Sequence, residues 1–227
     1  MPGSPEISVN KLGEYLTTSN AARRRTIIRQ QKNPPDAIVP RYRQAAEPIR
    51  AFLESGGSQV EIIHTAITQL RTATAGSEWV ANDNECTAQA LETFLDVASV
   101  LPIGDVVYVP GEHAPPKLEM NGVKIRVRPD FLLRIRRRSR ERIGALKIHY
   151  IKGDDKALKE AGQQYVATLC HQWLLENGPR GVQVSREDCY SLDVFRRSLV
   201  RAPAAVLRRM NEVMVGCSDI ALIWPAV

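Results

Sequence analysis

The residues in this chain most able to do chemistry lie between Val123 and Lys152, where an acid and a lysine fall in neighbouring segments. Asp130 follows Pro129, and Lys147 stands between aliphatic residues. Each segment is apolar at alternate positions, which predicts two β-strands. If the strands pair, a carboxylate and an ammonium group lie close together, beside a cluster of arginines that suits phosphate geometry.

The turn expected between these strands, residues 136–140, contains four arginines and one serine. Residues 123–152 contain eleven Lys or Arg and two acids, whereas residues 51–121 contain two Lys or Arg and ten acids. The net charge of the whole chain is +6. Such segregation is typical of an electrostatic footprint for a polyanion. The residues predicted to contact nucleic acid lie in the strands, in the turn and in an N-terminal helix: Arg126, Arg128, Arg134, Arg136, Arg137, Arg138, Arg140, Arg23, Arg24 and Arg25.

Each of these features also has a purely structural interpretation. Asp130 is surrounded in sequence by arginines and could form an ordinary ion pair, which at a surface contributes only about 0–1 kcal/mol. Lys147 could be a solvated strand lysine, but its aliphatic neighbours favour a position near the core, where a charge requires a partner. The arginine-rich turn could be a soluble hairpin tip.

The elements that must position these residues follow from the periodicity of apolar side chains. Asn121-Gly122 predicts a hairpin turn, and the strand after it alternates through Asp130. In the second strand Ala145, Lys147 and His149 share one side. Helices are expected at residues 8–16, 21–31, 42–53, 59–72, 77–100, 156–176 and 204–215, strands at 105–109, 123–130, 142–151 and 189–194, and an edge strand or packed tail at 220–224.

This order of elements, with a Pro-Asp step in one strand and a lysine in the next, resembles the PD-(D/E)XK (restriction-endonuclease-like) nuclease superfamily over residues 77–224. The resemblance implies an α/β (α+β) fold with a mixed central sheet flanked by helices. It divides the chain into a helical N-terminal region, residues 1–76, and a nuclease-like core, residues 77–227. It is strongest with the branches associated with defence systems and mobile elements.

The resemblance also implies roles for individual residues. Asp130 would be the metal-binding aspartate and Lys147 the catalytic lysine, with Mg²⁺ or Mn²⁺ polarising the phosphate and activating a water. Glu92 would be an additional metal-binding acid on the preceding helix. The family's second carboxylate is replaced by Ala145, and Glu160 on the following helix is the candidate substitute.

Two functions therefore remain open at this point. One is a metal-dependent DNA nuclease, and the other is an inactive nuclease-like module that binds DNA or serves as a protein-assembly subunit. The expected partners are nucleic acid, with DNA favoured over RNA, and a protein partner or a second copy of the chain. No membrane span, secretory signal or paired-cysteine motif is visible, which predicts a cytoplasmic protein without a membrane partner.

Overall fold

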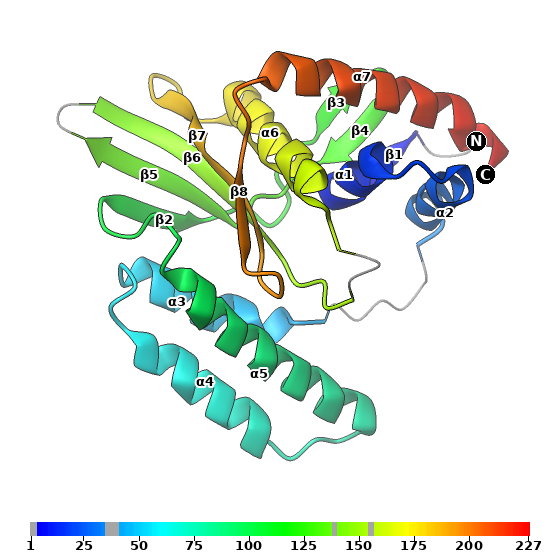
Figure 1. The fold of residues 1–227 in the computed structure, drawn as a ribbon. Coiled ribbons are helices and arrows are strands. Elements are labelled where there is room, and N and C mark those ends of the chain that lie inside the picture. Colours follow the sequence, from blue (N-terminus) through cyan, green and yellow to red (C-terminus); the bar gives the residue numbers. More distant parts are fainter. Residues whose placement is uncertain (1–3, 35–40, 138–139, 154–156) are drawn as a thin grey trace.

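The computed structural model describes residues 4–34, 41–137, 140–153 and 157–227, which form two β-sheets surrounded by helices (Figure 1). The larger sheet has the strand order β2-β5-β6-β7-β8, and the smaller has the order β1-β4-β3. The strands are β1 (Glu6–Ser8), β2 (Val106–Pro110), β3 (Leu118–Met120), β4 (Val123–Arg126), β5 (Phe131–Arg137), β6 (Arg140–His149), β7 (Gln183–Asp193) and β8 (Ser198–Arg201). The expected mixed α/β architecture is confirmed.

Helices lie on both faces of the larger sheet (Figure 1). One face carries α6, against which α1, α7 and the smaller sheet pack, and the other carries α3, α4 and α5. The α-helices are α1 (Val9–Thr17), α2 (Ala21–Lys32), α3 (Ala46–Glu54), α4 (Val60–Thr72), α5 (Glu78–Ala98), α6 (Glu160–Asn177) and α7 (Val206–Ile223). The short 3₁₀ segments are Arg43–Ala45 and Trp224–Ala226.

The alternation of side chains along β6 divides the interior into two apolar clusters. Ile143 and Ala145 point into the cluster formed with α6, whereas Leu146 and Ile148 point into the cluster formed with α3, α4 and α5. Successive strand residues face opposite sides of a sheet, so a central strand covered on both faces must be apolar in both registers. Lys147 and His149 are polar residues in the covered part of this strand, and each has a polar partner.

Local sequence signals fix several of the boundaries. The side chains of Ser8, Asn20 and Ser77 each accept a hydrogen bond from the backbone N–H three residues later and so begin α1, α2 and α5. Asn121 and Gly122 both have positive φ, 47° and 78°, at the turn that joins β3 to β4. This is the left-handed turn geometry that Asn-Gly favours in a two-residue hairpin.

Two expectations about the strands and the C-terminal segment were wrong. Residues 123–130 are not one strand, because β4 ends at Arg126 in the smaller sheet and β5 begins at Phe131 in the larger one. Pro129 lies between them and has no N–H with which to continue a ladder. Residues 220–223 are the last turn of α7, where Ile220 continues the buried face of the helix.

The first 76 residues contribute to both interior clusters. Helices α1 and α2 pack on the α6 side, and α3 and α4 pack on the opposite side together with α5. They also supply one strand, because β1 pairs in parallel with β4. Along the chain, the strands of the larger sheet and the helices beside them follow the order α5-β2-β5-β6-α6-β7. Strands β3 and β4 of the smaller sheet are inserted between β2 and β5.

Candidate functional site

Asp130 and Lys147 meet where β5 and β6 begin to pair. The Asp130 Oδ2 accepts hydrogen bonds from Lys147 Nζ at 2.8 Å and from the backbone N–H of Ile148 at 2.6 Å. The Asp130 N–H in turn donates to the Leu146 carbonyl at 2.9 Å. Strand β6 therefore holds Asp130 through both the backbone N–H and the side-chain carboxylate of that residue. The predicted contact between the acid and the lysine is present.

The backbone of Asp130 is held from the other side by Gly111, the residue that follows β2. The Gly111 N–H donates to the Asp130 carbonyl at 2.9 Å. A Cβ on Gly111 would lie 2.0 Å from the Pro129 carbonyl oxygen, so only glycine permits this close approach of the two backbones. The position of Asp130 is therefore set by backbone contacts on two strands.

Two arginines continue from this pair along the same face of β5. Across the β5–β6 pair, Leu132 lies opposite Ala145, Arg134 opposite Ile143 and Arg136 opposite Glu141. Side chains two residues apart share a face and are separated by about 7 Å. Helix α6 packs on β6, β7 and β8. Arg134 and Arg136 are exposed and line a surface hollow of about 320 Å³.

The other arginines predicted to contact nucleic acid are placed differently. Arg128 is exposed and lines a cavity beside Asp130. Arg126 lies in the smaller sheet, where its Nε is 3.3 Å from a Glu6 carboxylate oxygen and it donates to Gln31. The side chains of Arg137, Arg138 and Arg140 lie outside the described residues.

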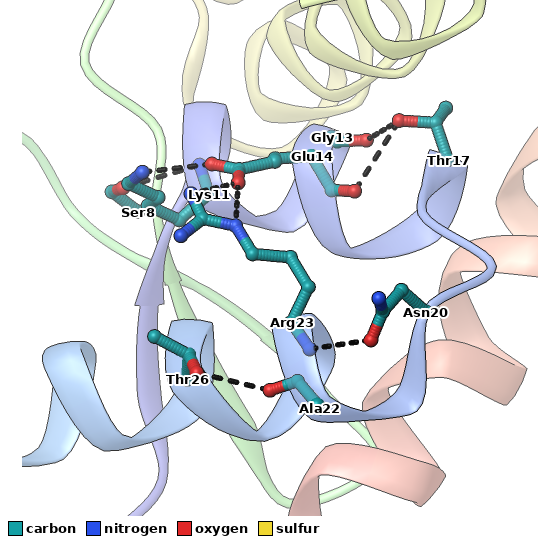
Figure 2. A network of polar contacts seen from close by, with 9 residues as sticks. All are labelled: Ser8, Lys11, Gly13, Glu14, Thr17, Asn20, Ala22, Arg23 and Thr26. Carbon is teal, nitrogen blue, oxygen red and sulfur yellow. Dashed lines mark hydrogen bonds and ion pairs between the residues drawn. The ribbon is translucent and has the colours of Figure 1, made fainter. Parts of the chain in front are cut away.

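The basic residues of α2 are largely committed to contacts inside the chain. Figure 2 shows Arg23 turned toward Glu14 of α1, to which its Nε donates at 2.7 Å. Arg24 donates to the Thr18 carbonyl at 2.8 Å and lies over the Tyr15 ring. Arg25 is exposed. This segment therefore offers fewer free guanidinium groups than its sequence suggests.

The three acids predicted to bind metal do not come together. Glu92 on α5 accepts hydrogen bonds from Arg71 of α4 at 2.7 and 3.0 Å. Glu160 begins α6 and accepts from Gln164 at 3.3 Å. Within the described residues, no three His, Cys, Asp or Glu side chains are grouped so that they could hold one metal ion.

Ala145 is fully buried among the apolar residues that face α6. A carboxylate at this position would have to enter a cluster of aliphatic and aromatic side chains, and burying an unpaired charge there is costly. The packing of this core therefore favours alanine over an acid at position 145. Any metal at Asp130 would rely on one carboxylate, water and the substrate phosphate, within the range that Mg²⁺ accepts.

A cavity of about 220 Å³ beside Asp130 brings in residues that the sequence did not single out. Glu47 and Arg50 of α3 form an ion pair at its edge, and Tyr150 after β6 also lines it. Glu47 lies in a segment that was expected to be helical, but no periodic signal shows that α3 packs beside the end of β5. Sequence reasoning therefore missed the second acid that lines this cavity.

A buried pair of polar residues, His149 and Ser191, lies near Lys147 on the α6 side of the sheet. His149 Nε2 is 2.7 Å from Ser191 Oγ, and both residues are buried. Burial, together with the nearby charge of Lys147, lowers the pKa of His149 to about 3. This histidine is therefore an uncharged structural residue at neutral pH, as expected for a hydrogen-bonded strand position.

No protein-family model matches the chain, and no curated protein sequence matches it. Within its described residues, none of the helices has both the length and the apolar character required to cross a bilayer. Function must therefore be argued from the geometry of Asp130, Lys147 and the arginines beside them.

The buried histidine predicts how stability depends on pH. The unfolded chain binds a proton at His149 below about pH 6.5, whereas the folded chain does so only near pH 3. The free energy of unfolding should therefore fall as pH drops through this window, by up to about 1.4 kcal/mol per pH unit from this group. In urea titrations between neutral and mildly acidic pH, His149→Gln should show a shallower fall. Parallel curves for the two proteins would contradict this assignment.

Proposed function

We propose that the chain binds the phosphate backbone of nucleic acid with the uncovered face of β5. The observation that supports this is the alignment of Asp130, Arg134 and Arg136 on that face, with both arginines exposed. Guanidinium groups can form two parallel hydrogen bonds to a phosphate, which makes exposed arginine rows suited to backbone contact. The sequence of the same hairpin places four arginines at residues 136–140.

The charge distribution supports a polyanionic partner. The chain carries a net charge of +6, and residues 123–152, which include the β5–β6 hairpin, hold eleven of its 31 Lys and Arg residues. Contacts to phosphate provide most of the affinity of non-specific nucleic-acid binding and make it fall with salt. Double-stranded DNA is the favoured partner, because a projecting basic hairpin can enter a duplex groove.

The order α5-β2-β5-β6-α6-β7 supports the nuclease-like framework inferred from the sequence. In it β2, β5 and β6 are antiparallel neighbours, and β6 and β7 are parallel and joined by α6. This is the element order expected for the PD-(D/E)XK superfamily, with Asp130 at the start of the second core strand and Lys147 in the third. We therefore propose that the binding face belongs to a nuclease-like core.

Binding is tested with the pair of arginines that the structure describes. Arg134→Gln with Arg136→Gln should weaken binding to a labelled DNA duplex by about tenfold or more, because two phosphate contacts are lost. The slope of log affinity against log salt should become shallower by about 2. Fluorescence anisotropy with duplex DNA, single-stranded DNA and RNA measures both quantities and ranks the three partners.

The matched control removes the same number of charges from α2. Arg25 and Arg29 are both exposed there. Arg25→Gln with Arg29→Gln should leave most of the affinity intact. Equal losses in the two double variants would mean that binding follows net charge and not the face of β5, and wild-type affinity in the hairpin variant would rule out the proposal.

Metal-dependent cleavage is the second candidate, favoured by the 2.8 Å contact between Lys147 Nζ and Asp130 Oδ2. When bound, a divalent ion would supply Lewis-acid activation of the phosphate and of a water. Asp130 would hold the ion, and Lys147 is placed to stabilise negative charge that develops on the phosphate oxygens. Glu47 is a second acid that lines the same cavity as Asp130.

Cleavage is tested with plasmid and single-stranded DNA in Mg²⁺ or Mn²⁺. Asp130→Asn and Lys147→Met should each lower the rate about 100-fold or more, because each removes a group at the reacting phosphate. Glu92→Gln and Glu160→Gln should cut at the wild-type rate, since these acids are engaged elsewhere. Absence of any cleavage, or cleavage that survives Asp130→Asn, would eliminate the nuclease and leave the binding proposal standing.

A further inference from the structure

Helix α7 has a second apolar face that is largely exposed among the described residues. Its inner face packs against α1, α6 and β4, with Val213, Cys217 and Ile220 buried. On the outer face Leu207, Val215 and Leu222 expose 82, 64 and 81% of their surface, and Met214 exposes 39%. Large side chains exposed in a row on one helix are typical of an interaction surface.

These residues form one continuous stripe. At about 100° per residue, the positions of Leu207, Met214, Val215 and Leu222 fall within roughly 100° of one another around the helix, together with Asn211 and Ser218. From Leu207 to Leu222 the stripe is about 22 Å long, at a rise of about 1.5 Å per residue. We refer to these six residues as the α7 stripe.

The α7 stripe is symmetric about a point between Met214 and Val215. Leu207 and Leu222 lie equally far from that point, and so do Asn211 and Ser218. If a second α7 ran antiparallel across this centre, Leu207 of one copy would lie level with Leu222 of the other at both ends, and in the middle methionine would lie beside methionine and valine beside valine. A two-fold interface requires this kind of self-complementary patch.

The charges beside the stripe favour the antiparallel arrangement. Arg208 and Asp219 lie on the same flank of the stripe, and in an antiparallel pair like flanks adjoin. Arg208 of one copy then lies within two residues, about 3 Å of helix rise, of Asp219 of the other. Both are exposed; Arg208 Nε lies 3.1 Å from Glu212 Oε1 of its own chain, whereas Asp219 has no ion-pair partner within the described part of the chain. Two such pairs form by symmetry.

The two polar residues in the stripe can also be satisfied. Ser218 Oγ accepts from Asn121 Nδ2 at 2.9 Å and donates to the Met214 carbonyl at 3.2 Å. When a second copy covers Ser218, its hydroxyl hydrogen therefore keeps an acceptor. Its second lone pair can accept from Asn211 of the other copy, which lies opposite. A single asparagine in an apolar helix seam fixes register, because any other alignment buries it without a partner.

We propose that the chain forms a two-fold dimer in which the α7 stripes of two copies pack antiparallel. The α7 stripe and the β5 arginines lie on the same side of the larger sheet but share no residue: α7 packs against α6, and α6 covers β6, β7 and β8 and leaves β5 uncovered. The proposal does not depend on nucleic-acid binding, since different residues build the two surfaces.

The orientation is tested by cross-linking full-length protein. Leu207→Cys and Leu222→Cys are prepared separately, one with a mass tag, then mixed and treated with a short thiol cross-linker. The mixture should give a cross-link between the two variants. Each variant alone should give little, because equivalent positions lie about 22 Å apart along the paired helices. The four native cysteines are buried and give a low background. Cross-linking of Leu207→Cys to itself would overturn the antiparallel arrangement.

Oligomeric state is measured by light scattering at tens of micromolar. The wild type should have twice the mass of one chain, and Leu207→Asp and Leu222→Asp should be monomeric with unchanged circular dichroism. Val107→Asp changes an apolar residue of β2 that is 63% exposed and should remain dimeric. Arg208→Asp and Asp219→Arg should each weaken the dimer, and their combination should restore it. A monomeric wild type, or a dimer indifferent to both Leu→Asp changes, would overturn the proposal.

Discussion

The site depends on how the Asp130 carboxylate is held against β6. One carboxylate oxygen accepts from the Ile148 N–H and from the Lys147 ammonium group. The backbone N–H of Asp130 donates to β6, and its carbonyl accepts from Gly111, which follows β2. An ammonium group on a central strand needs such a partner, because burial without one is unfavourable. The contact also fixes the register that places Arg134 and Arg136 on the open face of the hairpin.

Much of this arrangement follows from local sequence. The alternation through Ala145, Lys147 and His149 correctly assigns side chains to the two faces of β6, because strand geometry leaves little choice. Asn121-Gly122 correctly marks a hairpin, since both positions need positive φ. The meeting of Asp130 with Lys147 is also confirmed, although the path of the chain to Asp130 is not the continuous strand that was predicted.

What the sequence did not reveal depends on long-range packing. Pro129 signals a break in the ladder, yet no local rule shows that the chain changes sheet there. The spacing of Val213, Cys217, Ile220 and Trp224 is helical and could have extended the predicted last helix. The pairing of Arg23 with Glu14 and of Arg126 with Glu6 could not be predicted, because it depends on how α1 and β1 pack. These ion pairs reduce the basic surface to fewer residues than composition implies.

The distribution of exposed side chains gives the molecule two distinct surfaces. Arg134 and Arg136 are exposed on the uncovered half of the larger sheet, because α6 packs over β6, β7 and β8 and leaves β5 accessible. The outer face of α7 is apolar and self-complementary. The apolar cluster between α6 and the sheet also contains buried residues of α7 and buries Ala145. A carboxylate at position 145 would be buried in that cluster.

The most direct test of the account is a double-mutant cycle on Asp130→Ala and Lys147→Met, with the free energy of unfolding measured in urea. The cycle cancels the effect of leaving the Ile148 N–H without its acceptor and isolates the contact between the two side chains. The structure predicts a coupling of about 1 kcal/mol or more, since the lysine is only 14% exposed in its side chain. Additivity to within about 0.3 kcal/mol would show that the acid and the lysine do not hold each other, and the site as described would not exist.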